Sequence, residues 1–336
     1  MMKKFLQNRV AESHYALLTT AIYTFIVWYL GGLVGQRLYM QLGIFAVCTY
    51  LMMELNNANA LIRIYSRMVS CSFMVLSALS LYAIVPLGVS LVMLCFITFL
   101  LTLFNIYQDK HASGWAFYAF ACLGIASTIF PQIVFFVPFM WMFMGFLLMA
   151  LGPRTFWASV VGFVVPYWFI LPYCLLTGSM DFFVNHFRQL IDFQPLFRYD
   201  NIQLHQLLSF AITTLLAAIG TVHFLRNSFR DKIRTRMFFN IFIYLSLLIV
   251  IFIVLQPQHF NILISMLIVV TSPLIGHFVA LTRTRTTNVT FCLLMFIVVA
   301  ATLFNLLVTT GLLDVGSWMF NQPINTQHPS LITHAC

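Results

Sequence analysis

The stretch SMDFFVNHFRQLIDFQPLFRYDNIQLH, from Ser179 to His205, decides how the whole chain is interpreted. It is the longest run that the hydrocarbon core of a bilayer would exclude, because acidic and basic side chains lie close together in it: Asp181, His186, Arg188, Asp192, Arg198 and Asp200. Continuous apolar runs flank it on both sides, several of about 20 residues, which is the length that a membrane-spanning helix needs. The stretch therefore predicts a loop outside the bilayer between spanning helices.

The composition agrees with this interpretation. Hydrophobic residues make up 62% of the chain and charged residues only 7%, whereas soluble domains contain about 25% charged residues. The net charge of +9 would favour nucleic-acid binding in a soluble protein. Here the basic residues lie in short segments between apolar runs, where they set the orientation in the membrane instead. We therefore expect an integral membrane protein with the lipid bilayer as its partner and no nucleic-acid partner.

About eleven apolar runs reach spanning length, and helices are preferred to strands because the runs do not alternate. The candidate spans are Tyr15–Gly35, Leu38–Met53, Met68–Pro86, Gly88–Tyr107, Ser113–Phe130, Gln132–Leu151, Phe156–Leu176, Gln206–Leu225, Met237–Leu255, Phe260–Leu281 and Val289–Leu312. The expected fold is an all-α polytopic transmembrane helical bundle. It forms one integral membrane domain over residues 1–336, with an outer amphipathic loop at 178–205.

The distribution of basic residues predicts the orientation. With the N-terminus inside, only Arg37, Arg188 and Arg198 of the 17 Lys and Arg residues fall on the outer side. An excess of Lys and Arg in the inner loops is the expected bias of membrane proteins. The segment after Leu312 contains no Lys or Arg, which suits an outer C-terminus.

The outer loop is the first candidate site. Asp181, Asn185, Arg188 and Asp192 recur at helical spacing, and apolar residues take the other face, which is typical of a helix lying in the membrane interface. One interpretation is a solvated cap over the bundle. The other is a substrate site, for which we expect the following roles: Arg188, Arg198 and Asp200 bind an anionic substrate, and Asp181, His186 and Asp192 are catalytic.

An inner polar cluster is the alternative site. It combines Glu54, Asn57 and Arg63 with Asp109, although a simple positively charged inner loop would look the same. The run Arg226–Arg236 contains five basic residues and one acid, and predicts nonspecific binding of anionic lipid headgroups. His277 lies in an apolar span and is predicted to be hydrogen-bonded inside the bundle.

Other classes of membrane protein are disfavoured. Charged residues occur only at the ends of spans or in loops, which counts against an ion-coupled transporter. No two histidines are three or four residues apart and no CxxC occurs, so we expect no metal, no cofactor and no disulfide. Cys48, Cys71 and Cys95, like most of the seven cysteines, lie in apolar runs and fit small packing residues.

Four short motifs resemble an uncharacterised family of polytopic inner-membrane proteins from Bacteroidota. They are Glu54-Leu-Asn-Asn-Ala-Asn-Ala-Leu-Ile-Arg, Asn105-Ile-Tyr-Gln-Asp-Lys, the Phe130-Pro hairpin, and Gly152-Pro-Arg-Thr-Phe-Trp before a proline-bearing span. The resemblance implies a multi-pass protein of the bacterial inner (cytoplasmic) membrane and a link to envelope glycoconjugate assembly.

Two function classes follow. The first is an enzyme that acts on a polyprenyl-linked glycan or lipid in envelope biogenesis. The first outer loop, Gly35-Gln-Arg37, lacks the acidic pair that lipid-linked glycosyltransferases of one common type carry there. The second class is a non-enzymatic flippase, transporter or membrane assembly factor. Polar groups clustered in an outer cavity would favour the enzyme, and polar residues along the spans at mid-depth would favour the transporter.

Overall fold

The computed structural model describes residues 6–178, 180–190, 202–282 and 284–312, and every regular element in these ranges is helical. In chain order the helices are α1 (Leu6–Ala11), α2 (Ala16–Leu30), α3 (Tyr39–Asn59), α4 (Met68–Leu79), α5 (Leu81–Ile84), α6 (Leu87–Phe104), α7 (Ser113–Ile129), η1 (Pro131–Phe136), α8 (Val137–Phe146), α9 (Pro153–Thr177), α10 (Met180–Arg188), α11 (Leu204–Asn227), η2 (Ser228–Arg230), α12 (Ile233–Leu255), η3 (Pro257–His259), α13 (Phe260–Leu281) and α14 (Arg285–Thr309). The η elements are 3₁₀ helices.

Six of these segments are long and apolar enough to cross a membrane. They are Leu87–Phe104, Pro153–Thr177, Leu204–Arg230, Ile233–Leu255, Pro257–Leu281 and Arg285–Thr309. Shorter apolar helices cover Ala16–Leu30, Met68–Leu79, Ser113–Ile129 and Pro131–Phe146. The predicted all-helical bundle with segments of spanning length is therefore confirmed.

Two predicted spans are not single α-helices. Within Met68–Pro86, α4 ends at Leu79 and α5 begins at Leu81, because the chain leaves helical geometry at Ser80, with ψ at +37°. Gln132–Leu151 starts in the 3₁₀ helix η1, which has Pro131 at its start, and α8 ends at Phe146. Proline is common in the first turn of a helix because the N–H groups there have no partner within the helix, so the lack of one costs nothing.

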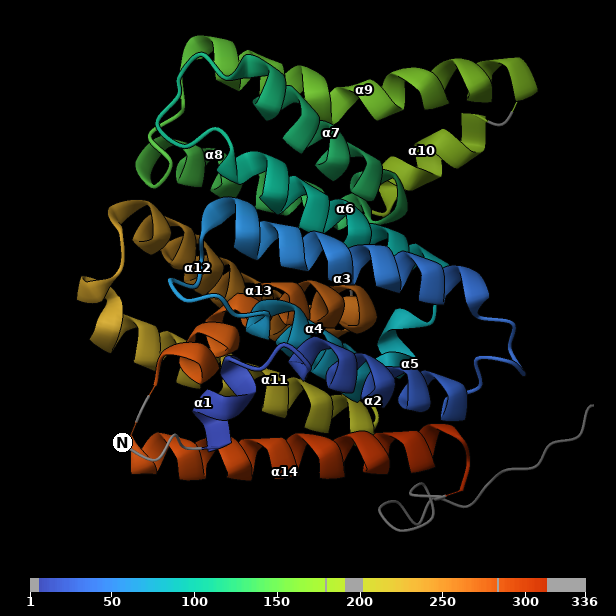
Figure 1. Cartoon of the computed structure of the whole chain (residues 1–336). Coiled ribbons are helices and arrows are strands. Elements are labelled where there is room, and N and C mark those ends of the chain that lie inside the picture. The colour runs from blue at the N-terminus through green and yellow to red at the C-terminus, as the bar shows by residue number, and fades with distance from the viewer. Residues whose placement is uncertain (1–5, 179, 191–201, 283, 313–336) are drawn as a thin grey trace, which may run out of the picture.

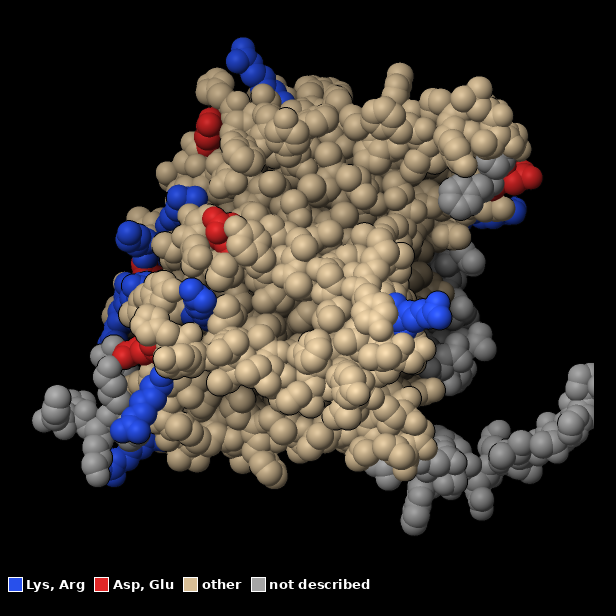
Figure 2. Space-filling view, turned by 45° about the vertical axis from the view of Figure 1, so that its right-hand side comes forward, with Lys and Arg blue, Asp and Glu red and all other residues tan. Residues whose placement is uncertain are grey.

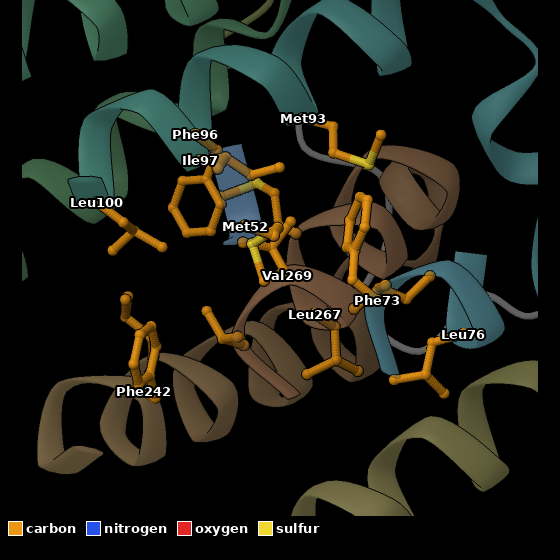
Figure 3. Packing of buried hydrophobic residues seen from close by; sticks show 14 of the residues in the cluster. Met52, Phe73, Leu76, Met93, Phe96, Ile97, Leu100, Phe242, Leu267 and Val269 are labelled. Carbon is orange, nitrogen blue, oxygen red and sulfur yellow. The ribbon is translucent and has the colours of Figure 1, made fainter. Parts of the chain in front are cut away.

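Helix α13 forms the centre of the bundle. Figure 1 shows α13 and α4 in the middle, with α3, α6 and α12 on one side and α2, α11 and α14 on the other. Nearly every residue of α13 is buried, as expected for a helix that is apolar on all faces. Leu267 and Val269 of α13 lie among Met52, Phe73 and Phe96 from three other helices (Figure 3).

The outermost helices expose large apolar side chains. On α9, Trp168 and Phe169 are 73% and 72% exposed, and Phe296 on α14 is 73% exposed. Apolar surface of this extent is unusual on a water-soluble monomer, whereas it suits contact with lipid. The outer faces of α9 and α14 therefore fit the bilayer.

Charged side chains gather at the ends of the bundle and mostly at one of them (Figure 2). We call this the basic end. It comprises α1, the segments 60–67, 105–112, 147–152 and 228–232, and residues 282 and 284, with the adjoining helical turns. Hydrogen bonds join these segments, such as Arg63 Nη1 to the Arg230 carbonyl at 3.2 Å and Gln108 N to the Leu148 carbonyl at 2.8 Å. Of the described Lys and Arg residues, only Arg37 and Arg188 lie at the opposite end.

Candidate functional site

A cavity of about 1000 Å³ opens at the basic end between α11, α13 and α14. Its lining comes from the loop after α3, from α11 and η2, and from the meeting of α13 with α14: Arg63, Ile64, Ala218, Ile219, Val222, His223, Arg226, Asn227, Arg230, Phe278, Ala280, Leu281, Thr282, Thr284, Thr287 and Thr290. Ligand pockets commonly measure about 300–1000 Å³. We call this the basic cavity.

Three arginines give the basic cavity its charge. Arg226 lies in the last turn of α11, Arg230 in η2, and Arg63 in the loop that follows α3. Among the described residues no carboxylate lines the cavity. Arginine can donate parallel hydrogen bonds to one phosphate or carboxylate group, so the lining suits an anion.

Asparagines of α3 position the loop that carries Arg63. The side chain of Asn56 donates to the Ser66 carbonyl at 3.1 Å and accepts from the amide of Ile62 at 3.2 Å. Helix α3 ends at Asn59, and the next residue, Ala60, is left-handed with a φ of +47°. Asn residues commonly bond to nearby backbone groups at helix ends, and here they fix the turn between α3 and α4.

A buried hydrogen bond between a histidine and a carboxylate lies beside the cavity. The Nε2 atom of His277 on α13 is 3.2 Å from Asp231 Oδ2, and both side chains are almost fully buried. Asp231 Oδ1 is 3.9 Å from Arg63 Nη1. A buried carboxylate is stable only when it is paired, so this contact ties the segment after η2 to the core of the bundle. The prediction that His277 is hydrogen-bonded inside the bundle is confirmed.

His223 lies between the His277–Asp231 contact and the cavity. It lines the cavity from α11, and its ring centre lies 5.4 Å from that of His277. Its Nδ1 atom is buried and has no hydrogen-bond partner. An imidazole nitrogen can donate or accept a hydrogen bond according to its tautomer. His223 therefore adds an imidazole ring to the cavity wall, with Nδ1 unpaired among the described residues.

Hydroxyl groups form the opposite wall of the cavity. Thr284 caps α14 by accepting from the Thr287 amide at 3.3 Å, and both threonines line the cavity with Thr282 and Thr290. The N-terminus of a helix carries partial positive charge. The α14 terminus therefore reinforces the preference for an anion that the arginines establish, whereas the hydroxyls of Thr282, Thr287 and Thr290 already donate to backbone carbonyls.

The predicted outer-loop residues are only partly described. Asp192, Arg198 and Asp200 lie outside the described residues. Asp181 and Arg188 lie on α10, where both are exposed. A helix therefore forms over much of the segment for which an amphipathic helix was predicted.

His186 of α10 faces α9. Its Nε2 atom is 3.1 Å from the Tyr167 hydroxyl, which is 2.8 Å from the Ser127 hydroxyl. Burial lowers the pKa of the His186 imidazole. These contacts hold α10 against α9 and α7. Among the described residues, no acidic side chain forms a hydrogen bond with His186, which was predicted to be catalytic.

The alternative inner cluster does not assemble as one group. Arg63 contacts Asp231, whereas Asp109 accepts from the His111 amide at 2.8 Å. Glu54 is half-buried and forms no ion pair within the described part of the chain, and Asn57 is exposed. The basic cavity thus takes Arg63 from the predicted cluster and adds Arg226 and Arg230 from the basic run.

Two features of the site did not follow from the sequence. His223 was not singled out, because it stands alone in an apolar run. Asp231 was grouped with its basic neighbours, and its partner His277 is 46 residues away in the chain. Comparison of the chain with protein-family models, curated proteins and solved structures found no match.

Proposed function

We propose that the protein is a multi-span membrane protein that binds the phosphate or diphosphate headgroup of a lipid in the basic cavity. The observation that carries the proposal is the convergence of Arg63, Arg226 and Arg230 on one cavity whose described lining has no carboxylate. A hydrogen bond to a charged group contributes about 1.5–3 kcal/mol. Two or three such contacts would select a phosphate over a neutral or zwitterionic headgroup.

The basic end is proposed to face the cytoplasm. The six long helices, together with α2, α3, α4–α5, α7 and η1–α8, would give about eleven passes. The concentration of Lys and Arg at the basic end supports this orientation. A phosphatase reporter fused after Leu312 should be active and one fused after Lys232 inactive; the reverse pattern would refute the orientation.

An apolar groove beside the cavity supports a lipid as the source of the phosphate. The groove measures about 480 Å³, lies between α1, α2, α4, α13 and α14, and is lined almost entirely by apolar groups. Phe278 lines both the groove and the basic cavity. An amphiphile could place its headgroup among the arginines and its chain in the groove, which favours a polyprenyl phosphate over free phosphate.

Binding of farnesyl phosphate to the purified full-length protein tests the proposal. The double variant Arg226→Gln/Arg230→Gln should bind at least about tenfold more weakly, because each lost contact is worth about 1.5 kcal/mol or more. Lys110→Gln/Arg154→Gln is the matched control. It removes two charges from the same end, and neither residue lines the cavity.

Three outcomes would overturn the proposal. Equal losses in the two double variants would indicate a general charge effect. Farnesol binding as tightly as farnesyl phosphate would exclude recognition of the phosphate. Inorganic phosphate binding as tightly as farnesyl phosphate would replace the lipid with a free anion.

A flippase or transporter is the second candidate. Buried polar side chains occur along α11 and α14 within the apolar helices, among them Ser209, Thr213, Thr302 and Asn305. Liposomes that contain a fluorescent prenyl phosphate would test this function, because movement between leaflets exposes the fluorophore to an external quencher. Movement no faster than in protein-free liposomes would exclude it. The bacterial inner-membrane location and the link to envelope glycans stay predictions.

A further inference from the structure

A second polar site lies at the opposite end of the bundle, where α4 is interrupted. The amide of Ala83 donates to the Ser80 carbonyl at 3.0 Å in a 3₁₀-type bond and not to the Leu79 carbonyl, its α-helical partner. The side chain of Asn305 on α14 donates to that Leu79 carbonyl at 2.8 Å. An asparagine from another helix thus satisfies the backbone group that the interruption releases.

Three helices bring further polar groups to this point. The Nδ2 atom of Asn305 also donates to the Ser209 hydroxyl of α11 at 2.8 Å. The ring of Tyr82 on α5 meets the ring of His205 on α11 edge-on, with centres 4.6 Å apart. Asn305, Ser209 and His205 are all buried. The cluster therefore lies inside the bundle and not on its surface.

Two buried polar atoms of the cluster have no hydrogen-bond partner among the described residues. One is Asn305 Oδ1, on a side chain whose two other hydrogen bonds are made. The other is the hydroxyl oxygen of Tyr82, which lies beside Ser80 and Ser209 without a hydrogen bond of good geometry. Buried polar groups are nearly always paired, with protein or with a bound molecule. Both residues line a cavity of about 200 Å³.

The cavity lining determines the chemistry of a ligand. Its other polar members are Gln36, Thr302 and Thr309, and none of its described residues is charged. Asn305 Oδ1 can only accept a hydrogen bond, so the ligand must donate one. The hydroxyls of Thr302 and Thr309 donate to carbonyls of their own helix at 2.7 and 2.9 Å, so they too can only accept from a ligand, whereas the Tyr82 hydroxyl can donate or accept. A neutral group with several hydroxyls meets both conditions, whereas an ion would lack a counter-charge.

We propose that this cavity, which includes Asn305 and Tyr82, binds a small neutral polyol such as a single sugar ring. The volume is below the range of about 300–1000 Å³ that is usual for larger ligands, which limits the ligand to about one ring. The site is independent of the phosphate-binding function proposed above, because it lies at the other end of the bundle and shares no lining residue with the basic cavity.

Saturation-transfer difference NMR of the full-length protein in detergent, with glucose as the probe, tests the inference. Glucose should give a signal that falls at least threefold in Tyr82→Phe and is lost in Asn305→Leu. Tyr82→Phe removes a hydroxyl that makes no hydrogen bond of good geometry with the described residues, so its thermal unfolding midpoint should stay close to that of the wild type. Tyr50→Phe is the matched control, since Tyr50 is exposed on α3 and lies outside the cavity.

Glucosamine replaces one hydroxyl of glucose with an ammonium group and should give a much weaker signal. The inference is overturned if glucose gives no signal above that from protein-free micelles. It is also overturned if a correctly folded Tyr82→Phe retains the full signal, or if glucosamine binds as well as glucose. A cavity that holds only ordered water would produce the first of these results.

Discussion

At the residue scale, Asp231 links one lining residue of the basic cavity, Arg63, to the core of the bundle. Its carboxylate contacts His277 in the core and lies near Arg63 in the loop after α3. Both partners lie far from Asp231 in the sequence, so one acidic side chain connects three segments of the chain. Because Arg63 also lines the cavity, the same carboxylate helps to place a ligand-binding group. Asp231 therefore affects ligand binding by positioning Arg63, without contacting the ligand itself.

The variant Asp231→Ala tests this structural role. It leaves His277 buried without its hydrogen bond, and an unpaired buried polar group costs about 1–3 kcal/mol. We expect the thermal unfolding midpoint of the detergent-solubilised protein to fall clearly. Asp109→Ala is the control, because that carboxylate is exposed and bonds only a nearby backbone amide. A fall of equal size in both variants would contradict the role given to Asp231.

At the element scale, α7 and α9 approach each other closely through two glycines. A Cβ atom added to Gly162 would lie 2.4 Å from the Phe117 carbonyl oxygen, and one added to Gly124 would lie 2.4 Å from that of Phe163. Small residues allow backbones of membrane helices to approach in this way. The pair α7–α9 supports α10, since Tyr167 and Ser127 form the hydrogen bonds that reach His186.

Substitution of Gly162 with alanine should separate this helix pair. Overpacking in a tight contact costs about 1–3 kcal/mol, so the unfolding midpoint should fall and amide exchange in α10 should rise. Gly114→Ala on α7 is the matched control, because a Cβ atom there meets no atom within 4 Å. Alanine also stabilises a helix by about 1 kcal/mol relative to glycine, so the control variant should be neutral or stabilising. Equal behaviour of the two variants would argue against close packing at Gly162.

At the scale of the whole molecule, the helical bundle could be predicted from the sequence, whereas the contacts between its helices could not. Apolar runs predict helices because a bilayer leaves no other partner for the backbone. Each predicted span contains at least one helix. Met68–Pro86 is interrupted at Ser80, and the Leu79 carbonyl that the interruption releases accepts from Asn305, which lies 226 residues away in the chain. No local pattern contains such a contact.

The candidate site, too, was predicted only in part from the sequence. Arg63 was predicted as a site residue because it lies in a polar segment, and the run Arg226–Arg236 was predicted to meet lipid headgroups. His223 and Asn305 were not singled out, since each stands alone among apolar residues. An isolated polar side chain within a spanning helix is costly unless it has a role, and that is the signal by which both could have been found.

Photolabelling of the protein in membranes tests the central claim most directly, namely that the basic cavity binds a lipid phosphate. The probe is a farnesyl phosphate with a diazirine near the phosphate group, and the labelled peptides are identified by mass spectrometry. We expect labels within residues 218–230 and 280–290, and their loss in Arg226→Gln/Arg230→Gln. Labels confined to α10, or labels in the cavity that persist in this variant, would contradict the account.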